Sequence, residues 1–392
     1  MKKPFFLAGA IVWAVIAAAA LLLLASSLAG ADLSGLIPGW TASGGIGGAF
    51  VNAVNSNTPL IKEEKFSAAG LNALEVSAKN QSIKITLTDG GEVAVRHYDI
   101  KSAPAFEAGV SGGKLSVDIQ RHYITLFNIS SPRLEIDLPR AFSGNVSLKS
   151  ASGSISLGGR GEWGSVSLDS VSGAVRFVGG LKCADLIINT VSGSVSLGDT
   201  HAGTAVIGSV SGALRLENLT FSGEGVLKNM SGSINAGNIA AAGLNIKSGS
   251  GAVRARDINV ARQLHISSAS GSQDAGYVKA DDFTIKGLSG SLRYSGISGA
   301  GLVDCLSGSI NIGALYVKGD VTVNSLSGTQ RLTLAPDQNA DIKISVMSGT
   351  IHAAGLDLSY TDKKGKNANG KIGNGSGGTL SIRAASGSVY IK

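Results

Sequence analysis

The chain is poor in the residues on which small secreted domains and most enzymes depend. Its 392 positions hold two cysteines, seven prolines, five histidines and 5% aromatic residues. Two cysteines cannot supply the disulfide framework of a small secreted domain. The histidines are scattered and show no metal-ligand spacing. We therefore expect neither a disulfide-stapled scaffold nor a metal enzyme.

Catalytic motifs are missing as well. No P-loop, HExxH, EF-hand or G-x-S-x-G motif occurs, and Asp169, Asp274 and Asp304 are isolated among Asn, Ser and Lys. Residues 373–378 satisfy G-x-G-x-x-G, but a dinucleotide fingerprint needs a strand before it and a helix after it. Neither is predicted there, and a flexible loop is the better interpretation. The sequence predicts no catalytic, cofactor-binding or metal-ligating residue, and we expect a protein that is not an enzyme and uses no cofactor.

Glycine, in contrast, is abundant, and much of it marks an internal repeat. The chain has 55 glycines, and a Ser-Gly pair recurs at steps of 18 to 21 residues, with one final step of 38. A fixed period of this size predicts a solenoid, in which each unit buries its apolar face against its neighbours. The repeat glycines are Gly153, Gly173, Gly193, Gly212, Gly232, Gly251, Gly271, Gly290, Gly308, Gly328, Gly349 and Gly387.

The residues around each glycine alternate with the period of a strand. Apolar residues lie seven, five and two positions before it, as in Val166, Leu168 and Val171, and two and four positions after it, as in Ile155 and Leu157. A spacing of two places these side chains on one face of a strand. The sequence therefore predicts an all-β, single-stranded β-solenoid. Each coil of about 20 residues would have two strands, a Ser-Gly corner and a variable return loop.

The corner itself has a physical interpretation. Glycine supplies positive φ or the absence of a Cβ, and the serine before it is expected to bond the turn backbone. Twelve coils at the strand spacing would extend over roughly 55 Å. Gln273 and Gln330 occupy positions where an apolar residue is expected, which predicts locally loosened coils. Cys183 and Cys305 would lie about six coils, roughly 29 Å, apart and are predicted to be unpaired.

The N-terminus predicts export. Lys2 and Lys3 precede an uncharged run from residue 5 to 31, which is long enough to cross a bilayer of about 30 Å. Residues 1–31 are therefore predicted to form a single transmembrane helix in the cell membrane, with a cytoplasmic N-terminus and an extracytoplasmic body. Ala29-Gly30-Ala31 also fits a signal-peptidase site, in which case the body is secreted. Residues 32–61 are predicted to be a flexible linker.

The rest of the chain divides into a cap and a repeat array. Residues 62–145 are strand-like but out of period, as expected for an N-terminal β cap that covers the open end of a solenoid. Residues 146–392 are the array. Residues 357–378 are predicted to be a solvated insert loop, after which residues 380–392 supply a last unit.

One outward position is distinctive. Three residues after the repeat glycine, arginine occupies every second coil, five times in succession, at Arg176, Arg215, Arg254, Arg293 and Arg331. Stacked coils would align these guanidinium groups about 10 Å apart. Arginine matches phosphate oxygens bidentately, so the column is a candidate polyanion-binding ladder. A row of arginine alternating with small polar residues equally serves solubility, and both interpretations stay open.

Three segments have a recognisable family pattern: residues 134–139 (LEIDLP) leading into Val146-Ser147-Leu148, the Val-Ser-Gly-Ser-Val-Ser-Leu units, and the closing segment 373–391. In these segments the chain resembles the bacterial DUF4097 family, which carries an adhesin label. It covers about residues 62–392. It implies a β-solenoid ectodomain, often membrane-anchored, in the bacterial cell envelope, and it implies no catalytic or ligand-binding residues.

These observations favour a non-catalytic extracytoplasmic envelope protein, an adhesin or scaffold, that binds an envelope polymer or a surface partner through its polar faces. The net charge of +7 is compatible with an anionic cell-envelope polymer. One alternative is a component of envelope stress or of a membrane complex, with another membrane protein as its partner. Another is a β-helix enzyme that acts on polysaccharides. We expect a membrane association through the N-terminal helix and no nucleic acid partner.

Overall fold

A computed structural model describes residues 58–99, 106–119 and 132–392. The predicted transmembrane helix at residues 1–31 and nearly all of the predicted linker lie outside these ranges. Within them the chain forms strands and turns only, and no helix there is long and apolar enough to cross a membrane. From Pro59 onward, the described residues belong to one compact unit with a continuous hydrophobic core. The prediction of an all-β solenoid is confirmed.

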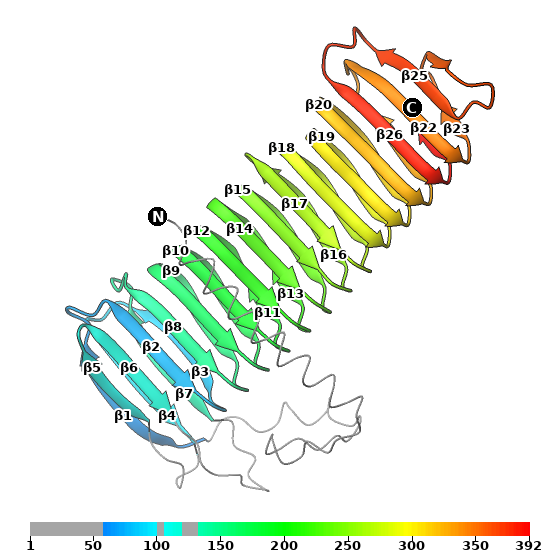
Figure 1. Ribbon diagram of the computed structural model, residues 1–392. Coiled ribbons are helices and arrows are strands. Elements are labelled where there is room, and N and C mark those ends of the chain that lie inside the picture. The colour runs from blue at the N-terminus through cyan, green and yellow to red at the C-terminus, as the bar shows by residue number, and fades with distance from the viewer. Residues whose placement is uncertain (1–57, 100–105, 120–131) are drawn as a thin grey trace, which may run out of the picture. The chain divides into compact units, whose positions relative to one another are not determined.

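The strands fall into an N-terminal group, a central array and a C-terminal group (Figure 1). The N-terminal group comprises β1 (Leu60–Ser67), β2 (Ala73–Ala78), β3 (Ser82–Thr88), β4 (Glu92–Tyr98), β5 (Glu107–Ser111), β6 (Lys114–Ile119), β7 (Arg133–Pro139) and β8 (Asn145–Ser150). The central array comprises β9 (Ile155–Ser170), β10 (Val175–Thr190), β11 (Val195–Leu197), β12 (Asp199–Ser209), β13 (Leu214–Leu216), β14 (Leu219–Asn229), β15 (Ile234–Ser248), β16 (Val253–Val260), β17 (Gln263–Ser268), β18 (Gln273–Ser289), β19 (Leu292–Ser307), β20 (Ile310–Ser327) and β21 (Gln330–Leu334). The C-terminal group comprises β22 (Ala340–Ser348), β23 (Ile351–Ala353), β24 (Leu358–Tyr360), β25 (Asn367–Ile372), β26 (Thr379–Ser386) and β27 (Val389–Ile391).

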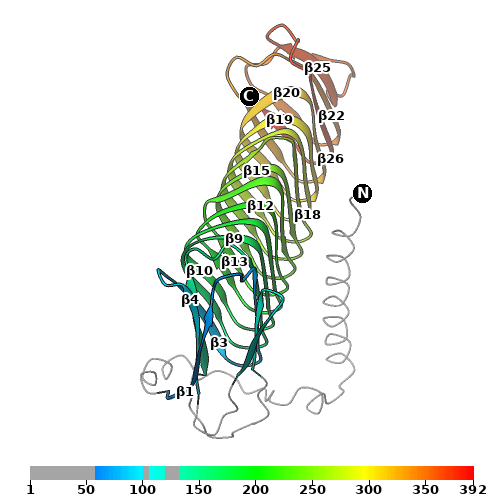
Figure 2. The same ribbon diagram turned by 90° about the vertical axis from the view of Figure 1, so that its left-hand side faces the viewer.

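Each coil of the array contributes to three parallel ladders rather than two. The upstream ladder holds the residues that precede the corner glycine, and the downstream ladder holds those that follow it. A third, return ladder lies where a loop was predicted, seven to nine positions after the glycine. Its register is continuous, and its buried members include Leu219, Ile239, Ile258, Val278, Ile297 and Leu315. Figure 2 shows the bends between ladders following one another from coil to coil. The prediction of a variable return loop is therefore wrong.

The corner glycines stack directly on one another. A Cβ on Gly173 would lie 1.9 Å from the carbonyl oxygen of Gly153, and the same contact recurs at each corner up to Gly328. No side chain fits into that space, since real Cβ atoms do not approach a carbonyl so closely. The ten glycines from Gly153 to Gly328 bound about nine complete turns. The prediction that like positions lie over one another is confirmed.

A buried polar side chain three positions before the glycine completes the corner. The Ser170 hydroxyl donates a hydrogen bond of 2.9 Å to the Gly173 carbonyl, and Thr190 donates one of 2.8 Å to the Gly193 carbonyl. The serine directly before the glycine bonds a different coil, because Ser172 donates to the Ala151 carbonyl over 3.2 Å. The buried donor satisfies a carbonyl that would otherwise be stranded in the interior.

The corner changes its backbone conformation halfway along the array. Gly290, Gly308 and Gly328 have φ of 125°, 148° and 128°, whereas the corners from Gly153 to Gly271 are not in the left-handed region. The change coincides with Gly287, which has no side chain and replaces the buried hydroxyl. In the second half the corner therefore requires glycine for its φ as well as for its space.

The position two residues before the glycine faces the solvent. Alternation buries positions seven, five and three before the glycine, and the chain then turns, so the next residue points outward. Leu288 is 57% exposed, Leu326 is 54% exposed and Met347 is 81% exposed. The prediction that this position shares the buried face is therefore wrong, although Val166, Leu168, Ile155 and Leu157 are buried as predicted.

The coils at Gln273 and Gln330 are closed rather than loosened. The Gln273 amide nitrogen donates to the Ser268 hydroxyl over 2.9 Å and to the Lys286 carbonyl over 2.7 Å. Gln330 makes the corresponding bonds to Ser325 and to the Arg383 carbonyl, both over 2.7 Å. Each amide thus ties its own coil to the next, and the predicted loosening is not observed.

The N-terminal end is built out of sequence order. Strands β2 and β3 pair with β8 and β9 on one side and with β6 and β7 on the other. The chain therefore forms the coil of β2 and β3 first and then the outer strands β4 to β7. It returns on the other side of β2 and β3, where β8 and β9 begin the array. Strands β5, β4 and β1 then add antiparallel edges. Strands β2, β3, β6 and β7 thus continue the parallel ladders to this end of the solenoid.

The C-terminal end is interleaved in the same way. Strand β26 pairs with β20 on one side and with β22 on the other, so the last coil in sequence lies inside the terminal one (Figure 1). Gly387 accordingly stacks on Gly328, and Gly349 stacks on Gly387. The insert at residues 357–378 is not simply a solvated loop, because it contains β24 and β25, which pair antiparallel with each other and, through β25, with β22.

Candidate binding surface: the arginine column

The five predicted arginines stand in one column on the downstream ladder. Arg176 pairs in register with Ser196, Ser196 with Arg215, and Arg215 with Asn235. The column continues through Arg254, Asp274, Arg293, Asn311 and Arg331. All five arginines are exposed. Strand pairing therefore aligns side chains that are 38 or 39 residues apart in sequence.

The residues between the arginines keep the positive charges apart, because a serine, an asparagine or an aspartate separates each arginine from the next. Two coil spacings separate the backbone positions of successive arginines, about 9.6 Å, which is close to the Debye length in 0.1 M salt. Asp274 is the one carboxylate within the column, and its Oδ2 lies 3.8 Å from Nη1 of Arg293. An exposed pair of this kind is weak and leaves the guanidinium able to bind another anion.

Hydroxyl groups run beside the arginines. The position directly after the corner glycine holds serine, threonine or alanine, and the hydroxyls of Ser309 and Ser291 lie 3.2 Å apart in neighbouring coils. A surface of guanidinium and hydroxyl donors suits the oxygens of phosphate, sulfate or carboxylate groups. The hydroxyl-bearing members are Ser154, Ser194, Ser233, Ser272, Ser291, Ser309, Thr329, Ser388 and Thr350.

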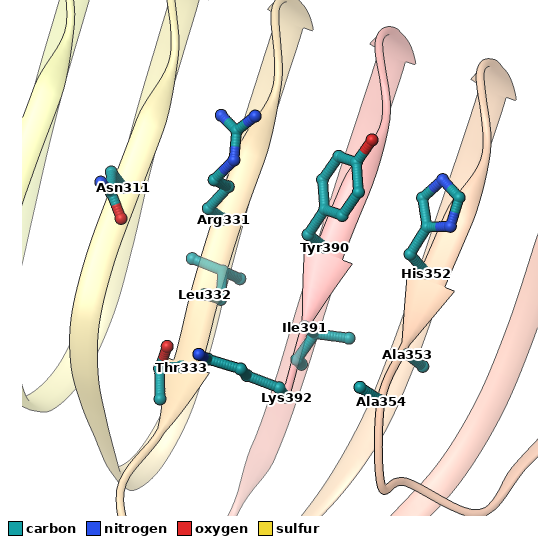
Figure 3. Close-up of a pocket in the computed structure, with 10 residues that line it drawn as sticks. All are labelled: Asn311, Arg331, Leu332, Thr333, His352, Ala353, Ala354, Tyr390, Ile391 and Lys392. Atoms are coloured by element: carbon teal, nitrogen blue, oxygen red, sulfur yellow. The ribbon is translucent and has the colours of Figure 1, made fainter.

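At its C-terminal end the column becomes aromatic. The Tyr390 ring lies 5.3 Å from the Arg331 guanidinium and stacks on the His352 ring at 4.5 Å and 11° (Figure 3). The three side chains come from β21, β27 and β23, which the interleaved end places next to one another. They border a shallow groove lined by Asn311, Arg331, Leu332, Thr333, His352, Ala353, Ala354, Tyr390, Ile391 and Lys392.

Sequence reasoning missed a second basic surface on the upstream ladder. Lys228 and Lys247 lie in adjacent coils, and Lys286 lies two coils further on in the same row, four positions before the corner glycine. Partial burial, with Lys247 and Lys286 nearby, holds the pKa of His265 below its ordinary value. This surface could have been predicted from the sequence, because lysine recurs four positions before the corner glycine.

The other residues considered from sequence contribute no site. Both cysteines are buried and free, as predicted, and burial raises the pKa of the Cys183 thiol to about 12. His352 is exposed and His265 half-exposed. Asp169 and Asp304 are separate from Asp274, on the upstream ladder. Among the described residues, no group of three or more His, Cys, Asp or Glu is placed to hold a metal ion.

The fold and its surface define a β-solenoid whose repeated positions form long polar and cationic rows. The chain belongs to the Toastrack DUF4097 family, whose model matches it twice, over residues 71–239 and 224–392. The predicted family is thus confirmed. No curated protein matches the chain.

Two solved structures resemble parts of the chain. One is described as a "putative cell adhesion protein" from Clostridium sporogenes; it is 12% identical, with a TM-score of 0.17, and the match covers 84% of this chain and 98% of that one. The other is described as a "putative adhesin" from Bacteroides fragilis; it is 17% identical, with a TM-score of 0.33, and the match covers 65% of this chain and 98% of that one.

Proposed function

We propose that this protein is a non-catalytic adhesin or scaffold of the bacterial cell envelope, which binds an anionic envelope polymer along the arginine column. The observation that carries the proposal is the register that aligns Arg176, Arg215, Arg254, Arg293 and Arg331 on one exposed face. The uncharged run at residues 5–31, after Lys2 and Lys3, supports export and anchoring in the cell membrane.

The geometry of the column favours a repeating ligand over a small one. The backbone positions of successive arginines lie about 9.6 Å apart, so a small anion can reach at most two neighbouring arginines of the five. A polymer with charges at comparable intervals can engage several in succession. Each contact raises the effective concentration of the next, so weak individual contacts sum to useful retention.

The aromatic end supplies a different kind of contact. Tyr390 is 40% exposed and stands beside Arg331 and Lys392 at the groove in Figure 3. An aromatic ring beside cationic groups suits a sugar ring that carries an acidic substituent. We propose that the polymer is an acidic or phosphate-bearing glycan whose end lies in this groove.

The test is retention of the protein on an immobilised polyanion, a phosphate-rich envelope polymer. Arg215→Ser, Arg254→Ser and Arg293→Ser together should elute at clearly lower salt than the unchanged protein, because three consecutive charges leave the column. The matched control, Lys182→Ser, Lys279→Ser and Lys318→Ser, removes the same net charge from exposed positions on the return ladder.

The experiment has three distinct outcomes. Loss of retention in the arginine variant alone supports the proposal. Equal losses in both variants mean that only net charge matters, and unchanged retention in the arginine variant ends the idea. In either of those cases the alternating arginines act as a solubilising surface.

A further inference from the structure

The corner ridge is an exposed apolar row along the edge between the upstream and downstream ladders. It consists of the residues two positions before the corner glycines, of which the largest are Val171, Met230, Leu288, Leu306, Leu326 and Met347. In its C-terminal half, Leu288 is 57% exposed, Leu306 48%, Leu326 54% and Met347 81%. A contiguous row of exposed apolar side chains indicates an interaction site.

The strand register makes the ridge continuous. The serines next to it pair in the order Ser289, Ser307, Ser327, Ser386 and Ser348. The ridge residues therefore follow in the order Leu288, Leu306, Leu326, Ala385 and Met347. At the strand spacing these five positions extend over about 19 Å.

Cationic side chains flank the ridge on both sides. On the downstream side stand Arg293 and Arg331, and on the upstream side stand Lys286 and Arg383, all exposed. One carboxylate, Asp304, shares the upstream row. An apolar edge between two basic flanks has the pattern of interfacial membrane-binding elements, which insert apolar side chains while lysine and arginine meet anionic headgroups.

We infer that the corner ridge docks on the surface of an anionic lipid bilayer. A second copy of this chain is disfavoured as the occupant, because an edge-to-edge contact in either two-fold arrangement would oppose basic flanks to basic flanks. The anchor predicted for residues 1–31 would hold the solenoid at such a surface. This docking shares Arg293 and Arg331 with the proposed polymer site, but the apolar residues that would enter the bilayer lie on the edge of the ladder and not on its face.

The experiment uses the full chain with one fluorescent label. Cys183 and Cys305 are buried, so a thiol-reactive, environment-sensitive dye labels Met347→Cys selectively, and the unchanged protein serves as the labelling blank. A second label position, Lys279→Cys on the return ladder, is the matched control. Each labelled protein is mixed with vesicles of phosphatidylcholine alone or with an equal share of phosphatidylglycerol, both containing a lipid-attached quencher.

The expected result is quenching at residue 347 that is at least fivefold stronger with phosphatidylglycerol than without it, and weak quenching at residue 279. In the Met347→Cys background, Leu288→Ser, Leu306→Ser and Leu326→Ser together should remove most of the effect while retention on the polyanion stays unchanged.

Three results would overturn the inference. One is equal quenching at both label positions. Another is quenching that the three serines do not reduce. The third is a change in dye emission that depends on protein concentration without vesicles, which would indicate a second copy on the ridge. If the arginine variant keeps its retention on the polyanion while the quenching at residue 347 is observed, the result counts against the proposed function only.

Discussion

The hydroxyl of Tyr294 donates a hydrogen bond of 2.6 Å to the side-chain Oε1 of Gln273, which lies in the preceding coil. Both side chains are buried. The Gln273 amide nitrogen meanwhile donates to Ser268 and to the Lys286 carbonyl. The amide is thus satisfied at both ends, which is how a glutamine is tolerated at a position that is apolar in most other coils.

Removing the Tyr294 hydroxyl tests this network. Tyr294→Phe leaves the Gln273 oxygen buried without its donor, which should lower the free energy of unfolding by about 1–3 kcal/mol. The measurement is a urea titration followed by circular dichroism. Tyr316→Phe, at a half-exposed tyrosine of the return ladder, is the control and should change stability by less than about 0.5 kcal/mol. Equal effects at the two tyrosines would contradict the account.

The stacked corners predict a strong position effect for alanine. A Cβ at Gly251 would lie 1.8 Å from the Gly232 carbonyl oxygen, whereas one at Gly109 meets no atom within 4 Å. Gly251→Ala should therefore force the two coils apart and destabilise the protein by about 3 kcal/mol, the upper part of the usual range for overpacking. Gly109→Ala should be nearly neutral. Comparable thermal midpoints for the two variants would rule out close stacking as the reason for glycine.

The buried thiol predicts a loss of stability in alkali. Burial, aided by the charge of Asp185, raises the pKa of Cys183 from its ordinary value of 9.0 to about 12. The unfolded thiol ionises first, so its contribution to native stability is fully present below pH 9 and is lost as pH rises towards 12. The free energy of unfolding, measured by urea titration at pH 8, 9, 10 and 11, should fall. Cys183→Ala should flatten that fall, and an unchanged slope would count against it.

The interleaved C-terminus predicts that truncation affects residues far upstream in sequence. Ending the chain at Gly378 removes β26, which is the partner of both β20 and β22. Hydrogen exchange should then show lost protection across residues 340–372, because β22 keeps only the hairpin strand β25 as a neighbour. Residues 155–289 should keep theirs, since solenoid coils depend mainly on adjacent coils. Full protection of β22 in the truncated chain would disprove the pairing.

The repeat made much of this architecture predictable. Alternation around Gly173 identified Val166 and Leu168 as buried, and equal spacing placed Arg176 and Arg215 in one column two coils apart. These features depend only on local period and on stacking, both of which are written along the chain.

Other features were missed for separate reasons. Leu288 lies an odd number of residues after the buried Phe283 and Ile285, so alternation itself places it on the outer face, and the prediction relied on its apolar character alone. The return ladder was missed because it is filled in places by small or polar residues, such as Thr200 and Ala241, although apolar residues recur there seven and nine positions after the glycine. The order of the coils at each end was not predictable from a repeat, since identical units can stack in any sequence.

The doubling back at both ends restricts how a protein of this kind can change in length. A coil appended after Lys392 would have to start beside β27, which already has β21 and β23 as neighbours, and so finds no free edge. A duplicated unit can be accepted only between Gly153 and Gly328, where every coil has the same kind of neighbour above and below. Longer or shorter relatives should therefore differ in the number of central coils and keep the interleaved strands at both ends.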